Sequence, residues 1–298
     1  MAVKTIALNI PFYAIFVAMR IRTLNGIDPT LVMEAFNKGF SDYSVPVQMT
    51  AEQWAYKMRS ENVQWNLSVG AFDEDQLVGF ILHGNKTRNG QQWVYNGGTA
   101  VIPSHRGQRL TQKMYDYILP ILREQSVSKI LLEVIDTNEP AITTYQAIGF
   151  KNTRRLLCFK GHYQAKILSN NYEIRTLATL DWAVLKTFGE VTPSWQNDIE
   201  AVELIRPQIK ALGIFRDNIL VGYLIYNPVS NKIFQLAIAK EQRQKGLASA
   251  LLQYAFGETD KPLILTNIED TATVTINCLN HFGLEHFITQ NEMALVMA

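Results

Sequence analysis

Apolar and polar positions recur with two different periods along the chain, and together they predict a mixed α/β protein. Runs rich in β-branched and aromatic residues predict strands at 20–24, 65–72, 77–84, 93–102, 129–135 and 151–160. Apolar residues with the helical period predict helices at 30–40, 50–61, 111–124 and 140–147. Helices packed on both faces of such a sheet give an α/β sandwich.

Local signals mark several element ends. Thr50 is a good N-cap for the second helix, and Gly149 is a good C-cap for the last one. The acidic turn at 73–75 predicts a hairpin between two strands. The helix at 111–124 is predicted to be amphipathic, with an apolar stripe formed by Met114, Tyr117, Ile118 and Ile121.

The same order of segments occurs twice, which indicates a tandem duplication. Residues 21–24 recur verbatim at 174–177, and 72–80 is echoed at 215–223. Arg106 then corresponds to Arg243, and Gly149 to Gly283. The predicted organisation is an N-terminal extension (1–18), a first domain (19–160), a polar linker (161–171) and a second domain (172–298).

Composition narrows the range of partners. A hydrophobic content of 47% over 298 residues suffices for two cores. The net charge of +1 argues against nucleic acid as the main partner. Two distant cysteines indicate neither a disulfide framework nor a metal site, and they favour a cytoplasmic protein. The apolar run at 5–18 is too short to cross a membrane. The oligomeric state is left open.

A loop at 243–248 carries the clearest chemical signal. It follows an apolar strand at 233–239 and opens a helix that runs to about Phe256. The unpaired N–H groups and the dipole at a helix start favour a phosphate anion. Gly246 lets the main chain approach such a ligand, and Arg243 and Lys245 flank the turn.

This loop resembles the pyrophosphate loop of the GNAT superfamily of N-acetyltransferases, which binds coenzyme A. The first half resembles the family at 101–108, 131–134, Asn138, Ala141, Tyr145 and 149–150, and the second half at 236–239, 243–248 and 283–284. The resemblance implies two tandem GNAT-like domains, each a mixed, mostly antiparallel sheet flanked by helices on both faces. It also implies acetyl-coenzyme A as co-substrate and no metal.

The resemblance assigns coenzyme A contacts to both halves. In the first loop, Arg109 and Thr111 stand where the family has small residues. The implied binding residues are Val101, Arg106, Gly107, Gln108, Arg109, Leu110, Thr111, Asn138, Ile238, Arg243, Gln244, Lys245, Gly246, Leu247 and Ala248.

The resemblance also implies that the first half is the catalytic one. Glu133 would be the base that deprotonates the amine, and Tyr145 would protonate the departing thiolate. The corresponding residues of the second half, Asn267 and Leu279, cannot exchange protons near neutral pH. From the residues alone, two alternatives stay open. Glu133 could be a strand residue paired with an arginine, and Tyr145 could be an ordinary residue of an amphipathic helix.

The expected function is therefore direct transfer of an acetyl group from acetyl-coenzyme A to a primary amine. The amine belongs to a small molecule, a peptide N-terminus or a lysine. One alternative is a binding or regulatory protein without turnover. The other places catalysis in the second half and leaves the first half structural.

Overall fold

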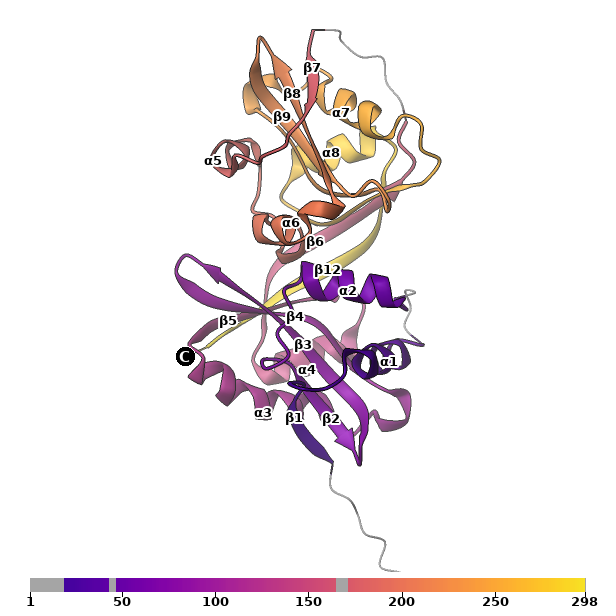
Figure 1. Cartoon of the computed structure of the whole chain (residues 1–298), viewed down its shortest axis with the longest axis vertical. Coiled ribbons are helices and arrows are strands. Elements are labelled where there is room, and N and C mark those ends of the chain that lie inside the picture. The colour runs from indigo at the N-terminus through magenta and orange to yellow at the C-terminus, as the bar shows by residue number, and fades with distance from the viewer. Residues whose placement is uncertain (1–18, 43–46, 165–170, 298) are drawn as a thin grey trace, which may run out of the picture.

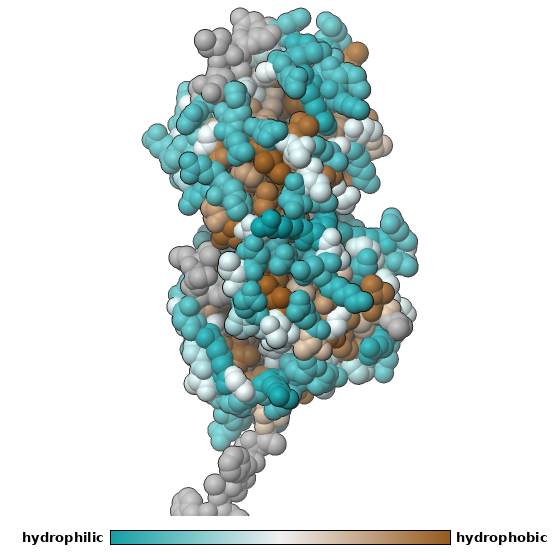
Figure 2. Space-filling view, turned by 180° about the vertical axis from the view of Figure 1, so that it is seen from behind, coloured by the Kyte–Doolittle hydropathy of each residue, from teal (hydrophilic) through white to brown (hydrophobic). Residues whose placement is uncertain are grey.

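The computed structural model describes residues 19–42, 47–164 and 171–297. They form a twelve-stranded sheet in the order β1-β2-β3-β4-β5-β12-β6-β11-β10-β9-β8-β7. Figure 1 shows two lobes, which correspond to the two halves of the sequence and are joined by the long strands β6 and β12. The surface is mainly hydrophilic, with patches of hydrophobic residues visible in both lobes (Figure 2).

Each half has the same order of elements. The first comprises β1 (Arg20–Thr23), α1 (Pro29–Gly39), α2 (Ala51–Ser60), β2 (Val69–Asp73), β3 (Gln76–Arg88), β4 (Gln91–Val101), α3 (Leu110–Glu124), β5 (Val127–Ile135), α4 (Glu139–Ile148) and β6 (Lys151–Gly161). The second comprises β7 (Glu173–Thr176), α5 (Trp182–Leu185), α6 (Ile199–Leu204), β8 (Lys210–Arg216), β9 (Ile219–Tyr226), β10 (Lys232–Ile238), α7 (Leu247–Phe256), β11 (Leu263–Glu269), α8 (Thr273–His281) and β12 (Glu285–Val296). Short 3-10 helices lie at Pro103–His105, Lys186–Phe188, Trp195–Asn197, Arg206–Gln208 and Lys240–Gln242.

The local signals act as expected at both helix ends. Thr50 accepts a hydrogen bond from the Gln53 N–H, and the Gln53 side chain accepts one from the Thr50 N–H, which completes a capping box for α2. Gly149 ends α4 with a φ of 111°, in the left-handed region where glycine is favoured. The predicted ends of these helices are therefore correct to within about two residues.

Two local predictions differ from the structure. The strand expected from residue 65 begins at Val69, because a hydrogen-bonded turn precedes it. On α3, Met114 and Ile118 are buried as predicted, but Tyr117 is 38% exposed and Tyr115 is buried in its place. The buried stripe of α3 is therefore rotated toward Tyr115 and Leu122 relative to the prediction.

Helices cover both faces of the sheet, as the α/β prediction requires. In the first half, α3 and α4 pack against one face around Met114 and Ile142, and α1 and α2 cover the other around Phe36 and Trp54. The second half repeats this with α7 and α8 on one side and α5 and α6 on the other. Within the described residues, the parallel strand pairs are β4 with β5 and β10 with β11.

The two halves exchange their last strands. We expected residues 151–160 to close the sheet of the first domain, but β6 pairs with β11 of the second half and with β12. Conversely, β12 pairs along its length with β5 of the first half, from Gln290 opposite Ile135 to Val296 opposite Lys129. Each half therefore completes the sheet of the other, and a single continuous sheet results.

Candidate active site

The two predicted phosphate loops share one backbone shape. In the first loop, Gly107 and Arg109 have positive φ values of 77° and 55°. In the second loop, Gln244 and Gly246 have φ values of 61° and 77°, so glycine occupies the other of the two left-handed positions. Among the described residues, no side chain caps the start of α3 or α7. The first N–H groups of both helices therefore suit an anion.

The loop arginines brace the main chain. Arg106 donates to the Val101 and Gly39 carbonyls and forms a bidentate pair with Asp42, at 2.6 and 2.8 Å. This pairing lowers the pKa of Asp42 and raises the pKa of Arg106. Arg243 donates in the same way to the Ile238 and Phe188 carbonyls, both at 3.1 Å. Both guanidinium groups tie their loop to the end of the preceding strand, so anion contacts are left to the backbone.

A cavity of about 510 Å³ opens beside the second loop. All its lining residues lie between Phe188 and Phe282. They come from the loop after α5, from β10 and β11, from the 243–249 turn and from α8. The parallel pairing of β10 with β11 extends over only Lys232 and Ile233, after which the strands diverge. The cavity therefore extends from the start of α7 into the space between the two diverging strands.

Of the predicted coenzyme A contacts, six from the second half line this cavity: Ile238, Arg243, Gln244, Gly246, Leu247 and Ala248. Lys245 lies in the same turn and donates to the Glu241 carbonyl. In the first half, Asn138 caps α4 by accepting from the Ala141 N–H. Val101 ends β4, Gln108 is exposed in the loop, and Leu110 and Thr111 begin α3. The assignment of these residues to coenzyme A stays a prediction.

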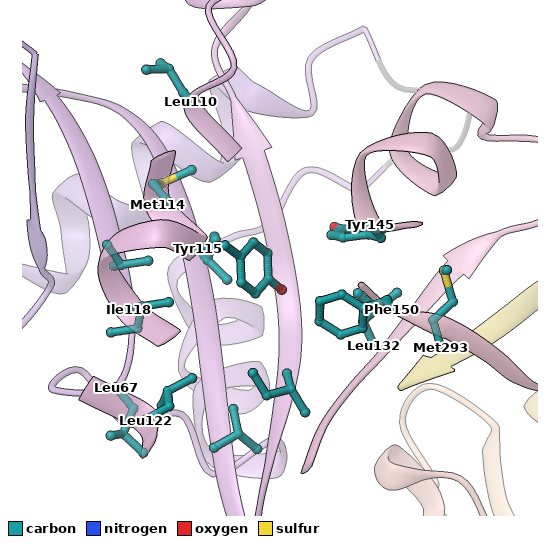
Figure 3. Close-up of a cluster of buried hydrophobic side chains, with 14 of the residues drawn as sticks. Leu67, Leu110, Met114, Tyr115, Ile118, Leu122, Leu132, Tyr145, Phe150 and Met293 are labelled. Atoms are coloured by element: carbon teal, nitrogen blue, oxygen red, sulfur yellow. The ribbon is translucent and has the colours of Figure 1, made fainter. Parts of the chain in front are cut away.

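Three aromatic side chains pack together on the α3 and α4 side of the first half. Tyr115, Tyr145 and Phe150 pack edge to face, with ring centroids 5.5 to 6.5 Å apart (Figure 3). Tyr145 is only 8% exposed. In the aligned repeat, the equivalent positions of the second half hold Leu252, Leu279 and Leu284. Of these leucines, Leu279 lines the cavity, and Leu252 and Leu284 are buried in the core of the second half.

A segment of the second half also covers the first. Trp195, fully buried, stacks on Tyr95 of β4 with ring centroids 5.2 Å apart. Lys86 donates to the Trp195 carbonyl at 2.8 Å and lies over its ring. Gln196 donates to the Tyr95 hydroxyl and to Glu61, both at 3.2 Å. The 3-10 helix Trp195–Asn197 of the second half thus packs over Tyr95 of β4 in the first half.

Glu133 lies at the junction of the halves, apart from Tyr145. Its Oε2 accepts from the Tyr95 hydroxyl at 2.9 Å and from the Asn267 amide at 2.6 Å. Burial raises the pKa of Glu133 to about 7, against the opposing effect of the Tyr95 hydrogen bond. The Tyr145 ring packs against Tyr115 and Phe150. The structure therefore gives the predicted base and acid different surroundings, and their catalytic roles stay predictions.

Two parts of the cavity wall were not predicted. The loop from Phe188 to Pro193 lines one side, and Glu190 holds it to α8 by accepting from the Val274 and Thr275 N–H groups. Arg154 of β6 donates to the Thr192 carbonyl at 2.8 Å. Asn267 of β11 also lines the cavity and was not predicted as a binding residue. The loop has no distinctive sequence motif that could have predicted it. Asn267 could have been singled out, because it aligns with Glu133 in the sequence repeat.

No helix in the described part of the chain is long and apolar enough to cross a membrane. The predicted extension 1–18 lies outside the described residues, as does most of the linker. Among residues 19–42, 47–164 and 171–297, no group of three or more His, Cys, Asp and Glu side chains is arranged to hold a metal ion.

Comparisons with known proteins agree with the repeat. The family model of the GNAT acetyltransferases matches residues 31–150 and again 172–272. N-alpha-acetyltransferase 30 of Schizosaccharomyces pombe is 28% identical over 99 residues, and the match covers 31% of this chain and 63% of that relative's length.

Two solved structures share the fold over nearly the whole chain. A GCN5-related N-acetyltransferase from Sphaerobacter thermophilus has a TM-score of 0.70 and 14% identity, covering 94% of this chain and 96% of that one. A tandem GNAT protein from the clavulanic acid biosynthesis pathway has a TM-score of 0.67 and 13% identity, covering 94% and 99%. With the family model matched in both halves, the chain belongs to the GNAT acetyltransferase family and is built as a tandem of two such domains.

Proposed function

We propose that the second half binds acetyl-coenzyme A in the cavity beside α7 and transfers its acetyl group to a primary amine, while the first half serves as scaffold. The observation that carries the proposal is the cavity itself, which runs from the uncapped start of α7 between the splayed strands β10 and β11. In the first half, the position equivalent to the cavity-lining Leu279 holds Tyr145, which packs against Tyr115 and Phe150.

The residues present fit the co-substrate. The first N–H groups of α7 suit the pyrophosphate, and the space between β10 and β11 suits an extended thiol-bearing arm. The diverging strand β10 leaves main-chain N–H groups that can stabilise the negative charge on the thioester oxygen during transfer. Holding both substrates together supplies much of the rate in such a reaction. A cytoplasmic location, where this metabolite is made and used, is part of the proposal.

The acceptor is a primary amine of a small molecule, a peptide N-terminus or a lysine. The name of the fission yeast relative includes N-alpha-acetylation, which is a reason to include peptide N-termini in an acceptor panel. Thiol release from acetyl-coenzyme A across such a panel tests the reaction. Binding of acetyl-coenzyme A without turnover on any amine would favour the alternative of a binding or regulatory protein.

A pair of matched variants assigns the reaction to one half. Gly246 and Gly107 both have a φ of 77°, and a Cβ at either position meets no other atom within 4 Å. Glutamate at either position therefore introduces similar backbone strain and one negative charge, at the N-cap of α7 for Gly246 and two residues before the N-cap of α3 for Gly107. We expect Gly246→Glu to abolish acetyl-coenzyme A binding in calorimetry and Gly107→Glu to leave it within about twofold. The reverse result would return the site to the first half.

A further inference from the structure

One wall of the second-half cavity is an irregular point in β11. Leu265 pairs with Phe159 of β6 and Ile268 pairs with Leu157, so Thr266 and Asn267 lie opposite the single residue Cys158. Asn267 has a φ of 63°, in the left-handed region that most residues avoid. It also lines the cavity. The shape of the wall at this bulge therefore depends on the contacts that hold the Asn267 side chain.

The Asn267 side chain is held by residues from other strands. Its amide Nδ2 donates to Glu133 Oε2 at 2.6 Å, and Glu133 belongs to β5 of the first half. Its Oδ1 accepts from Gln290 Nε2 of β12 at 3.0 Å. The Cys158 thiol of β6 lies 3.5 Å from the same oxygen. The contact with Glu133 is the shortest of the three, so Glu133 is the main anchor.

Glu133 is itself fixed within the junction between the halves. Tyr95 donates to the same Oε2 at 2.9 Å, and Gln196 donates to the Tyr95 hydroxyl. Within the described residues, the other oxygen of Glu133 is buried and has no hydrogen-bond partner. The Trp195 ring stacks on the ring of Tyr95, which belongs to β4 of the first half. These contacts orient the carboxylate toward Asn267 and toward the second half.

We propose that Glu133 of the first half is a positioning residue for the coenzyme A cavity of the second half, acting through Asn267. The contact spans the two exchanged strands, because β12 and β6 lie between β5 and β11 and join the halves in one sheet. The inference rests on the proposed function, since it assigns a role toward the ligand proposed for that cavity. Without the Glu133 carboxylate, the bulge at Asn267 loses its strongest anchor and the cavity wall relaxes.

The test measures acetyl-coenzyme A binding to the full-length protein by calorimetry. Glu133→Ala removes the anchor. Asn267→Gly removes the amide that is anchored but still tolerates the left-handed backbone. We expect each variant to weaken binding about tenfold and the double variant to weaken it by about the same factor, because both changes remove one interaction. Glu133→Gln keeps an oxygen that accepts from Asn267, and we expect it to bind as the wild type does.

The outcomes separate the two proposals. Wild-type protein that shows no binding of acetyl-coenzyme A would reject the proposed function. Wild-type binding with an unchanged affinity in Glu133→Ala would reject the positioning role alone. So would a double variant weakened about a hundredfold, because additive effects mean that the two residues act independently. Failure of Glu133→Gln to restore the affinity lost in Glu133→Ala would also overturn it.

Discussion

Replacing Glu133 by glutamine should stabilise the protein at alkaline pH while changing little at acid pH. Glu133 is half-buried at the junction of the halves with one carboxyl oxygen fully enclosed, and the pKa of its carboxyl rises from an ordinary 4.5 to about 7. Burial is the main cause, and the neighbouring Glu292 and Glu61 add to it. Lys232 of β10 and the Tyr95 hydrogen bond oppose the increase. Glutamine imitates the protonated side chain and carries no charge at any pH.

The sign of the effect follows from proton binding. Between pH 4.5 and about 7 the unfolded chain has lost this proton and the folded protein retains it. The free energy of unfolding of the wild type therefore falls as the pH rises through this window. Each unit of pKa difference corresponds to about 1.4 kcal/mol, so the full effect above pH 7 is about 3 kcal/mol. At pH 5 the wild type has lost only about 1 kcal/mol of it.

Denaturant unfolding followed by tryptophan fluorescence, at pH 5, 6, 7 and 8, measures the effect. The quantity of interest is the difference between Glu133→Gln and wild type, which should grow by about 2 to 3 kcal/mol in favour of the variant from pH 5 to pH 8. The new amide group replaces an oxygen without a partner among the described residues, and any cost from it is independent of pH. The exposed Glu124→Gln variant is the control, with no such pH-dependent difference expected. A difference between Glu133→Gln and wild type that stays constant across the pH range would refute the reasoning.

Two further substitutions examine the division between the halves. Tyr145→Phe removes a hydroxyl from a ring packed against Tyr115 and Phe150, so we expect the acetylation rate with a responsive amine to stay within about twofold; a loss of 10²-fold or more, the usual size of an acid–base contribution, would restore Tyr145 as the catalytic acid. Trp195→Ala empties a fully buried site against Tyr95 and Lys86, which should lower the free energy of unfolding by about 3–5 kcal/mol in denaturant titrations. A loss below about 1 kcal/mol would mean that the junction repacks around the gap.

The loops and most elements could be predicted because their signals are local. Gly149 at a helix end, Thr50 at a helix start and Gly246 beside basic residues each act within a few residues of the chain. The strand exchange is not local. The hydrophobic pattern of β6 fits a place beside β5 as well as one beside β11, and β12 is its repeat. Periodicity specifies a strand but does not specify its neighbour.

The location of the cavity depended on side-chain volume rather than on motifs. The first half has the fuller set of family residues, including Glu133 and Tyr145, and so the sequence favoured it. In three dimensions Tyr145 is packed in the core of the first half together with Tyr115 and Phe150. Its counterpart Leu279 was visible in the sequence, but that Leu279 lines a cavity follows only from the packing of α8 beside β10 and β11.

Glu133 and Asn267 occupy equivalent positions in the two copies, each at the same distance before the glycine that follows the next helix. The exchanged strands bring these equivalent positions together at 2.6 Å. Two unchanged copies would have placed two glutamates there, and like charges buried at such a distance cannot both ionise. An asparagine in one copy converts that repulsion into a hydrogen bond from amide to carboxylate. The exchange thus gives a physical reason for the two copies to differ at this position: one half carries the acid, and the other carries the amide that donates to it.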